Sequence, residues 1–513
     1  MRRRFLVTPF LFAFASLLQL NYIASNVVSP DQLFRPLIVV WLLIGLLIWP
    51  AYWLTHDWNW AVLLLTIFAV GFSSSTSFFS TVLILVIMAG VCWVAFLRLR
   101  RMKFSLTHLM YILMGTSIFF TVYAFVLESA MLNRIPWTGY RQAVRDARSY
   151  SLTNLSGPTI KPDIYYIVVD GYARSDILQG MFKYDNSEFI NSLEEKGFVV
   201  PGSNHSNYPA TPLSIASTLN MDYVQAFVPA LDQSPHRWLM APFIDHSRVR
   251  ALLESLGYKT ISLSTNWTIT ENVTTDLYLR PYPVMLTDFE GFVLDLTPLQ
   301  LFEPALGSFA SLPTAESHRE VIRYDFETLA GLANIQGPKF VFAHIISPHP
   351  PFVFDRDGKP VDSQYSFTFQ DANEFPGSSK EYPRRYVEQV QYVNRKLEEM
   401  IDAILAQSGT PPIIILQADH GSGMLTDLTS PDNTCIQERF SPFAAYYLPQ
   451  LTSDLIPNNI SNVNIFRILF DQYFKAGLPL LENKQYFYKG TQAYYDFEDV
   501  SSRINDRCVL PKQ

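Results

Sequence analysis

The feature that most constrains this chain is the near absence of acidic side chains from its first quarter. The whole chain of 513 residues contains 46 acids, but residues 1–130 contain only Asp31, Asp57 and Glu128. Long apolar stretches fill the same region, and about 20 mostly apolar residues suffice for a helix to cross a membrane. The first 130 residues therefore cannot form an ordinary soluble domain.

Five apolar stretches of this kind each predict a transmembrane helix. They cover residues 5–24, 34–54, 58–76, 79–97 and 105–127. The third is the weakest, because serine and threonine crowd its end at residues 73–77. The first follows three arginines at positions 2–4 and could be a signal peptide, but it has no clear cleavage site and further spans follow it. We therefore expect a retained helix and a bundle of about five helices.

Positive charge predicts the orientation of these helices. The arginines at positions 2–4 and the basic cluster at positions 98–103 both favour the cytoplasmic side. Four crossings separate the two clusters, so their predictions agree, and everything after about residue 130 should lie outside the cytoplasm. None of the five stretches holds the acid pair that a transporter usually needs at depth, so the helices are expected to anchor the outer domain.

The composition change suggests three segments. Residues 1–129 are expected to form a transmembrane domain, residues 130–160 a polar linker, and residues 161–513 an outer domain. The net charge of −7 belongs to the outer domain and argues against nucleic acid as a partner. Cys435 and Cys508 lie in this domain and either pair, if they face an oxidising space, or remain free thiols.

Short apolar runs alternate with helical patterns in the outer domain. Residues 163–169 form a run rich in β-branched and aromatic side chains, which suits a strand buried on both faces of a parallel sheet. Three similar runs, each after a helical stretch, occupy residues 258–263, 339–344 and 412–417. This alternation predicts an α/β domain with a mainly parallel sheet.

Metal-ligating side chains stand at the ends of three of these runs. They are Asp170 after the first, His344 and His349 after the third, and Asp419 and His420 after the fourth. In open parallel sheets, ligands bind at the carboxyl ends of the strands. Each residue alone has a commoner structural explanation, such as a turn or a helix cap for an aspartate. Together, carboxylate and imidazole groups at one edge predict a site for one divalent metal ion, Zn or Mn.

A hydroxyl group near a helix start supplies a candidate nucleophile. Residues 207–219 are typical of a loop followed by a helix that begins near Pro212, with Thr211 at the cap. Capping alone would explain a threonine there. A hydroxyl at a helix N-terminus is also well placed for attack, because the helix dipole stabilises a phosphate and a bound metal lowers the hydroxyl pKa.

The order of these motifs resembles the sulfatase branch of the alkaline phosphatase superfamily. The motifs are DIYYIVVDGYARSD at residues 163–176, the Thr211 segment, FVFAHIISPHPP at residues 340–351 and IIILQADHG at residues 413–421. Five spans before an outer catalytic domain look like lipoteichoic acid synthase and the phosphoethanolamine transferases that modify lipid A. The resemblance covers residues from about 160 to about 450 and implies an alkaline-phosphatase/sulfatase-like fold.

The resemblance also implies a role for each matching position. Four residues would bind the metal: Asp170, Thr211, Asp419 and His420. Thr211 would in addition act as the nucleophile and carry the transferred group covalently. Two residues would hold the anionic oxygens of the substrate or assist the leaving group: His344 and His349. Arg174 lies one turn past Asp170 and would either steady a phosphate or be an ordinary surface arginine.

Two positions depart from the sulfatase pattern. Typical sulfatases carry paired acids at the first strand end, where this chain has Asp170 followed by Gly171. They also convert a Cys or Ser into formylglycine, in a segment with a proline and an arginine. Here Thr211 precedes Pro212 with no arginine nearby, and a threonine cannot become formylglycine. Asp170 also stands where some phospholipid head-group transferases use Glu, and this difference leaves the identity of the metal open.

The leading hypothesis is a metal-dependent phospho-group transferase or phosphodiesterase on the outer face of a bacterial cytoplasmic membrane. It would move a phospho-group from a phospholipid or lipid-linked donor, through Thr211, to an envelope glycan or lipid. Three alternatives stay open. The first is a non-catalytic binding or regulatory protein, which Gly171 motivates, and the second is a sulfuric-ester hydrolase. The third is a transporter with an outer accessory domain.

Overall fold

The computed structural model describes most of the chain. The described residues are 5–73, 106–153, 155–158, 160–228, 231, 234–296, 303–361, 365, 367–378, 380–506 and 508. They divide into two compact units. Unit 1 comprises Met1–Ile135 together with Leu286–Leu312, and unit 2 comprises Pro136–Met285 together with Pro313–Gln513.

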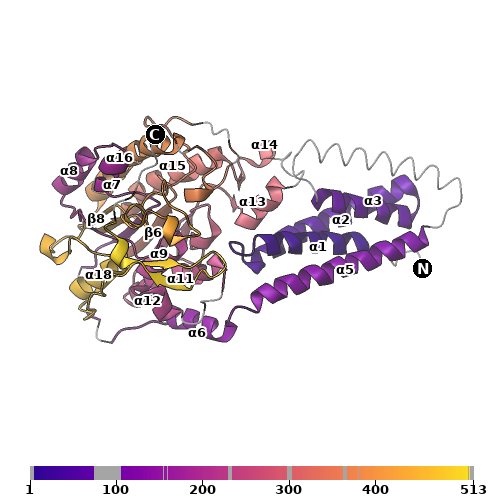
Figure 1. Ribbon diagram of the computed structural model, residues 1–513, viewed down its shortest axis with the longest axis horizontal. Coiled ribbons are helices and arrows are strands. Elements are labelled where there is room, and N and C mark those ends of the chain that lie inside the picture. Colours follow the sequence, from indigo (N-terminus) through magenta and orange to yellow (C-terminus); the bar gives the residue numbers. More distant parts are fainter. Residues whose placement is uncertain are drawn as a thin grey trace. The chain divides into compact units, whose positions relative to one another are not determined.

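Unit 1 is built from apolar helices that lie side by side (Figure 1). They are α1 (Thr8–Ile23), α2 (Phe34–Thr55), α3 (Trp58–Ser73) and α5 (Thr107–Leu132), with a short 3₁₀ turn at Pro30–Leu33 before α2. These helices coincide with four of the five predicted spans. The predicted span at residues 79–97 lies outside the described residues.

Two segments of unit 1 are long and apolar enough to cross a membrane by themselves: Pro30–Thr55 and Thr107–Leu132. Their surfaces are apolar as well, since Leu46 on α2 is 71% exposed and Phe119 on α5 is 64% exposed. Helices Thr8–Ile23 and Trp58–Ile67 are apolar but shorter. A bundle of about five spans therefore stays a prediction, with two candidate spans in the described residues.

One segment of unit 1 comes from far along the chain. Helix α13 (Asp288–Asp295) buries Phe289 and Val293 in a cluster with residues of α1 and α2 that include Leu18 and Leu37. The Glu290 carboxylate pairs with Arg35, the second residue of α2. The Phe289 N–H donates to Gln32 Oε1 over 3.1 Å. Because Gln32 and Arg35 stand where α2 begins, α13 is fixed to that end of the helices.

Unit 2 contains a six-stranded sheet with the strand order β3-β2-β6-β1-β7-β8. The strands are β1 (Ile164–Val169), β2 (Lys259–Leu263), β3 (Leu277–Leu279), β6 (Lys339–Ile345), β7 (Ile413–Gln417) and β8 (Ala444–Tyr447). All neighbouring pairs are parallel except β7 and β8. The predicted mainly parallel sheet is therefore confirmed, with its four predicted strands at β1, β2, β6 and β7.

Helices cover both faces of the sheet, as expected for strands without a polar face. On one face, Tyr165, Ile167 and Val169 of β1 pack in a core formed with α15 (Ala315–Gly331) and α16 (Glu381–Gln407). On the other face, Tyr166 contacts Phe466 of α18 (Ile465–Phe474), with ring centroids 5.2 Å apart.

Shorter elements complete the two units. The remaining helices are α6 (Trp137–Arg148), α7 (Ser175–Met181), α8 (Ser187–Glu195), α9 (Thr211–Asn220), α10 (Val224–Phe227), α11 (Ala241–Asp245), α12 (Arg248–Ser255), α14 (Glu303–Leu306) and α17 (Ile436–Arg439). The remaining strands are β4 (Val284–Met285), β5 (Ala310–Ser311), β9 (Tyr486–Tyr488) and β10 (Phe497–Asp499). Helix α6 occupies much of the segment that the sequence predicted to be a linker.

A disulfide joins Cys435 to Cys508, which are 73 residues apart in the sequence. Of the two arrangements that the sequence left open, the structure has the paired one. Cys435 is the N-cap residue of α17, so the bond ties the end of the chain to this helix. Disulfides persist in oxidising spaces outside the cytoplasm.

Candidate metal centre

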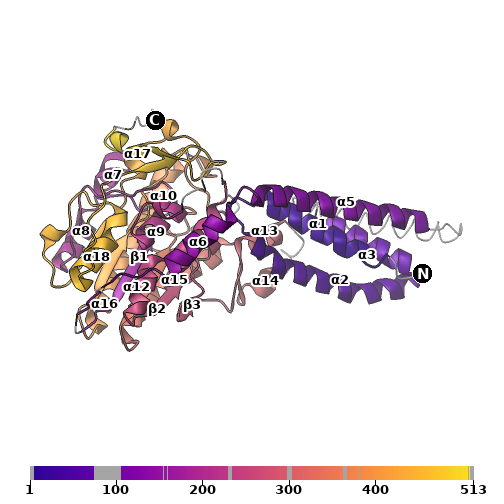
Figure 2. The same ribbon diagram turned by 90° about the horizontal axis from the view of Figure 1, so that it is seen from below.

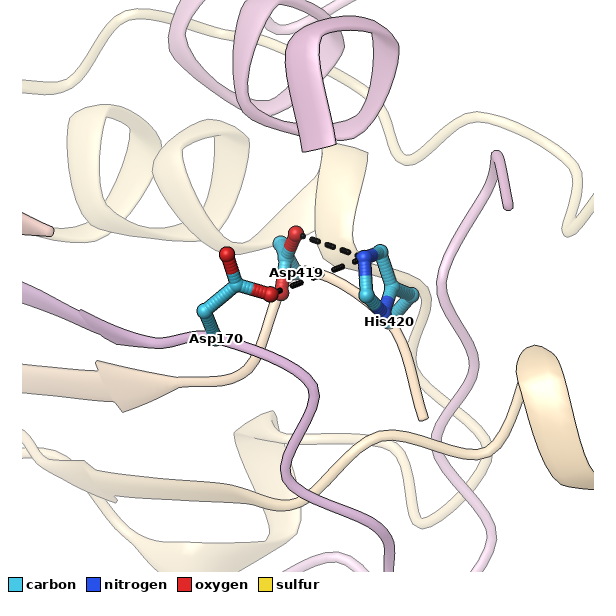
Figure 3. A group of neighbouring side chains, drawn as sticks. All are labelled: Asp170, Asp419 and His420. Carbon is cyan, nitrogen blue, oxygen red and sulfur yellow. Dashed lines mark ion pairs between the residues drawn. The ribbon is translucent and has the colours of Figure 1, made fainter. Parts of the chain in front are cut away.

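The site lies where the three central strands of the sheet end. Strand β1 pairs with β6 on one side and with β7 on the other, so their carboxyl ends meet. Asp170 follows β1, His344 is the last residue but one of β6, and Asp419 and His420 follow β7 by two and three residues. Figure 3 shows Asp170, Asp419 and His420 converging on one point.

Asp170, Asp419 and His420 offer three ligand atoms that lie within 4.8 Å of one another. His420 Nε2 is 3.2 Å from Asp419 Oδ2 and 3.6 Å from Asp170 Oδ1. All three side chains are buried, yet neither of these two carboxylate oxygens has a hydrogen-bond donor among the described residues. Buried carboxylate oxygens without a partner are costly. A divalent cation would satisfy them, so these residues fit a metal ion.

The protonation states of these groups also suit a metal. Burial opposes ionisation of Asp170, but the charge of His349 and the hydrogen bond from His344 outweigh it and lower the pKa of Asp170. Burial and the nearby Arg439 guanidinium lower the pKa of His420. At neutral pH the site therefore presents an ionised carboxylate and a neutral imidazole.

Neighbouring groups hold two of the three ligands, Asp419 and His420, in place. The Gly171 N–H donates to Asp419 Oδ1 over 3.1 Å. The other ring nitrogen of His420, Nδ1, is 2.9 Å from the Gly421 carbonyl oxygen. An Nδ1–H bond to this oxygen leaves the Nε2 lone pair for a metal. A Cβ on Gly421 would lie 2.0 Å from the Glu438 carbonyl oxygen, so only glycine fits there.

Thr211 points its hydroxyl at the same place. Thr211 Oγ1 is 3.1 Å from His420 Nε2. The sequence suggested that Thr211 caps α9, but the structure places Ala210 at the N-cap and Thr211 in the first helical position. Capping therefore does not explain this hydroxyl, which faces the candidate metal ligands.

The two other predicted histidines also belong to this cluster. His344 Nε2 is 3.2 Å from Asp170 Oδ2, and its Nδ1 is 3.0 Å from Thr270 Oγ1. His349 Nε2 is 3.7 Å from Asp371 Oδ2. Burial alone would lower the pKa of His349, but the Asp170 and Asp371 carboxylates outweigh burial and raise it.

Arg174 does not join the other six predicted residues. Its guanidinium pairs with Asp176 at 2.7 Å and donates to the Asn204 carbonyl oxygen over 2.5 Å. In the described part of the chain, its side chain contacts none of the candidate metal ligands. Arg174 is buried, with 8% of its surface exposed, so it is not an ordinary surface arginine, and a contact with a substrate phosphate stays a prediction.

Two further residues of the site, Arg439 and Asp371, were not predicted from the sequence. Arg439 Nη2 is 3.1 Å from His420 Nε2, and Nε donates to the Pro209 carbonyl oxygen over 2.7 Å. Nη1 pairs with Asp371 Oδ2 at 2.9 Å. Arg439 therefore connects the loop before Thr211 with a candidate metal ligand. It stands in the short helix α17, far from any strand end, so no pattern marked it.

A comparison with protein-family models identifies the family of the chain. A family model described as Sulfatase matches residues 162–466. This is more than half of the chain, and the chain belongs to the sulfatase family. No curated protein matches the sequence.

Several solved structures are similar to the chain. The C-terminal periplasmic domain of EptC from Escherichia coli has 11% identity and a TM-score of 0.45, covering 68% of this chain and 96% of that one. The corresponding domain of the phosphoethanolamine transferase EptC from Campylobacter jejuni has 12% identity and a TM-score of 0.37, covering 62% of this chain and 92% of that one. The integral membrane lipooligosaccharide phosphoethanolamine transferase A from Neisseria meningitidis has 12% identity and a TM-score of 0.39, covering 81% of this chain and 75% of that one.

We expect Asp419→Ala to abolish metal binding, because it removes one of the two carboxylates that face the cation. Elemental analysis of protein purified without chelator would find transition metal in the wild type. Apparent affinity should fall by at least about 100-fold in the variant. The exposed Asp185→Ala serves as the control. Equal metal content in Asp419→Ala and the wild type would contradict the assignment.

We expect Arg439→Lys to slow turnover while leaving metal content close to that of the wild type. Lysine keeps the charge, but its single ammonium group cannot contact the Pro209 carbonyl oxygen, the Asp371 carboxylate and His420 Nε2 together. Turnover of bis-p-nitrophenyl phosphate should fall by about 100-fold. The exposed Arg384→Lys is the control, and unchanged turnover in Arg439→Lys would show that the guanidinium geometry is dispensable.

Glu438 holds the loop that follows the metal ligands. Its carboxylate accepts hydrogen bonds from Ser422 Oγ over 2.6 Å, Met424 N over 2.8 Å and Leu425 N over 2.8 Å. Burial raises the pKa of Glu438 to about 7, although these donors oppose the rise. Between the pKa values of the unfolded and folded states, the folded chain therefore binds more protons than the unfolded chain.

The free energy of unfolding should accordingly fall as the pH rises from about 4.5 to about 7, by roughly 3 kcal/mol from this group. The apparent Tm of the wild type, measured in detergent, is expected to decrease across this range. Glu438→Gln should have a lower Tm at acid pH but a flatter pH dependence. Glu399→Gln, an exposed change, controls for the loss of charge. Identical slopes in Glu438→Gln and the wild type would rule out the raised pKa.

Proposed function

We propose that this chain is a metal-dependent phospho-group transferase or phosphodiesterase that acts on a lipid-linked substrate of the bacterial envelope. The observation that carries the proposal is the position of Thr211. Its hydroxyl lies 3.1 Å from His420 Nε2, beside two buried carboxylate oxygens without a hydrogen-bond donor among the described residues. A nucleophile beside a cation site is the arrangement needed for attack on an anionic ester.

In the proposed reaction, Asp170, Thr211, Asp419 and His420 hold one divalent ion, Zn or Mn. When bound, the ion supplies positive charge that lowers the pKa of the Thr211 hydroxyl and neutralises the oxygens of the substrate. With its pKa lowered in this way, the Thr211 hydroxyl would release its proton to water. Thr211 Oγ1 then attacks the phosphorus while the bond from phosphorus to the leaving oxygen breaks. The phospho-group is then linked to Thr211.

The surrounding side chains assist both halves of this exchange. His349 has a raised pKa and in its protonated form donates a proton to the leaving oxygen. His344 and Arg439 orient the anionic oxygens, since each lies beside one of the metal ligands. In the second half, a hydroxyl of an envelope glycan or lipid, or water in a hydrolase, gives its proton to His349. The oxygen of this hydroxyl or water attacks the same phosphorus, and the bond from phosphorus to Thr211 Oγ1 breaks.

The apolar helices support a lipid donor and an outer location. We infer a multi-pass protein with five spans in residues 1–129, the connecting segment at 130–160 and the catalytic domain at 161–513. The contact of α13 with the start of α2 supports this orientation, because it joins that end of the helices to a segment from the later chain. The Cys435–Cys508 disulfide supports an oxidising compartment, such as the space outside the cytoplasmic membrane.

Gly171 no longer favours the non-catalytic alternative. Its backbone has φ +68, a region that favours glycine, and its N–H donates to Asp419. Glycine at this position therefore serves the metal ligands. A sulfuric-ester hydrolase of the formylglycine type would need a different residue at position 211.

We expect Thr211→Ala to abolish transfer, with a fall in turnover of at least about 1,000-fold, because the covalent step is lost. Full-length protein in vesicles is incubated with radiolabelled phospholipid, and Thr211 is searched for a phospho-adduct by mass spectrometry. Thr211→Ser should retain an adduct. Thr218→Ser, a neighbour on α9, is the control. Full turnover in Thr211→Ala would sink the covalent mechanism.

A further inference from the structure

Helix α6 (Trp137–Arg148) is labelled in Figure 2, and its buried and exposed residues lie on different faces. One face is buried in unit 2, where it carries Tyr140 and Ala147. The Tyr140 hydroxyl donates to the Leu239 carbonyl oxygen over 2.9 Å, and its ring meets Phe243 edge-on at 5.9 Å between centroids. These contacts fix the rotation of α6 about its own axis.

The exposed side of α6 carries a stripe of arginines. Arg141, Arg145 and Arg148 follow a spacing of four and three residues, which places them on one face of a helix. All three are exposed, and no ion pair joins any of them to a carboxylate among the described residues. Arg145 donates to Gln142 Oε1 over 2.5 Å. The Arg141 guanidinium lies over the Trp137 ring, 5.4 Å from its centroid. We call Arg141, Arg145 and Arg148 the arginine stripe.

In the sequence, only a short connection separates the helix that carries this stripe from a candidate membrane span. Helix α5 ends at Leu132 and α6 begins at Trp137, so four residues connect them. At full extension this connection reaches about 18 Å. An exposed arginine, Arg134, lies within it. Four arginines thus follow the outer end of α5 directly.

These arginines are unexpected on that side. Basic residues next to a span favour the cytoplasmic side, where the cluster at 98–103 is predicted to lie. Four arginines after α5 oppose that orientation, and their charges are not used in ion pairs within the described residues. The apolar face of α6 packs against unit 2, but clusters of exposed arginines beside a span attract anionic lipid head groups by their charge.

We propose that the arginine stripe binds the phosphate groups of anionic phospholipids in the outer leaflet. The net charge of −7 would repel the rest of the chain from such a surface, so the stripe also selects which side of unit 2 faces the membrane. The proposal rests on the membrane location inferred above. It is independent of the transfer reaction, because binding is measured without turnover.

The test counts lipids that stay bound to the full-length protein. The protein is placed in vesicles of phosphatidylcholine and phosphatidylglycerol at about three to one, extracted in mild detergent and examined by native mass spectrometry. The wild type should retain phosphatidylglycerol above its share in the vesicles. The combination of Arg141→Gln, Arg145→Gln and Arg148→Gln should reduce this enrichment by about tenfold at low salt. Salt at 0.5 M should remove most of the difference between the variant and the wild type, because the screening length falls to about 3 Å near 1 M salt.

Two further variants keep the result interpretable. The control combines Arg356→Gln, Arg384→Gln and Arg395→Gln, at three exposed arginines elsewhere in unit 2. It changes the net charge by the same amount and should retain the enrichment. The combination of Arg141→Lys, Arg145→Lys and Arg148→Lys keeps the charge, and its enrichment should stay within about twofold of the wild type. Unchanged enrichment in the stripe-to-Gln variant would overturn the proposal, as would an equal loss in the control or in the Lys variant.

Discussion

The parallel pairing of β1 with both of its neighbours is the contact on which the rest of unit 2 depends. Val169 is aligned with Ile345 of β6, and Val168 with Gln417 of β7, so the three strands end together. The ligands Asp170 and Asp419 reach one point only because this register holds. A slip by one residue would turn every side chain of β1 to the other face and carry Asp170 away from His420.

The same arrangement concentrates negative charge at a buried edge. Asp170, Asp419 and Asp371 are all nearly inaccessible to water. Buried carboxylates are tolerated when cations or hydrogen bonds compensate them. Arg439 compensates Asp371 directly, whereas one oxygen each of Asp170 and Asp419 has no donor among the described residues. Arg439 therefore balances the negative charge at Asp371, whereas a bound cation would be needed to balance the charge at Asp170 and Asp419.

The strands and their terminal residues could be predicted because each is a local pattern. Residues 163–169 alone indicate a buried strand, and Asp170 follows them directly. Arg439 and Asp371 could not be predicted, since their contact joins positions 68 residues apart in segments without periodicity. Thr211 shows a subtler limit. A threonine at a helix start looks like a cap in the sequence, and only the position of Ala210 at the N-cap shows that its hydroxyl is available.

The placement of α13 has a practical consequence for anyone who wishes to crystallise the catalytic domain. A fragment beginning at Pro136 would keep residues 286–312 but lose the helices that cover Phe289 and Val293, which are 0% and 4% exposed in the full chain. Two apolar side chains and the Glu290 carboxylate would then face water without Arg35. Such a fragment should tend to aggregate in aqueous buffer. Shortening the excursion between Met285 and Pro313 would remove the exposed patch and leave the sheet and its ligands untouched.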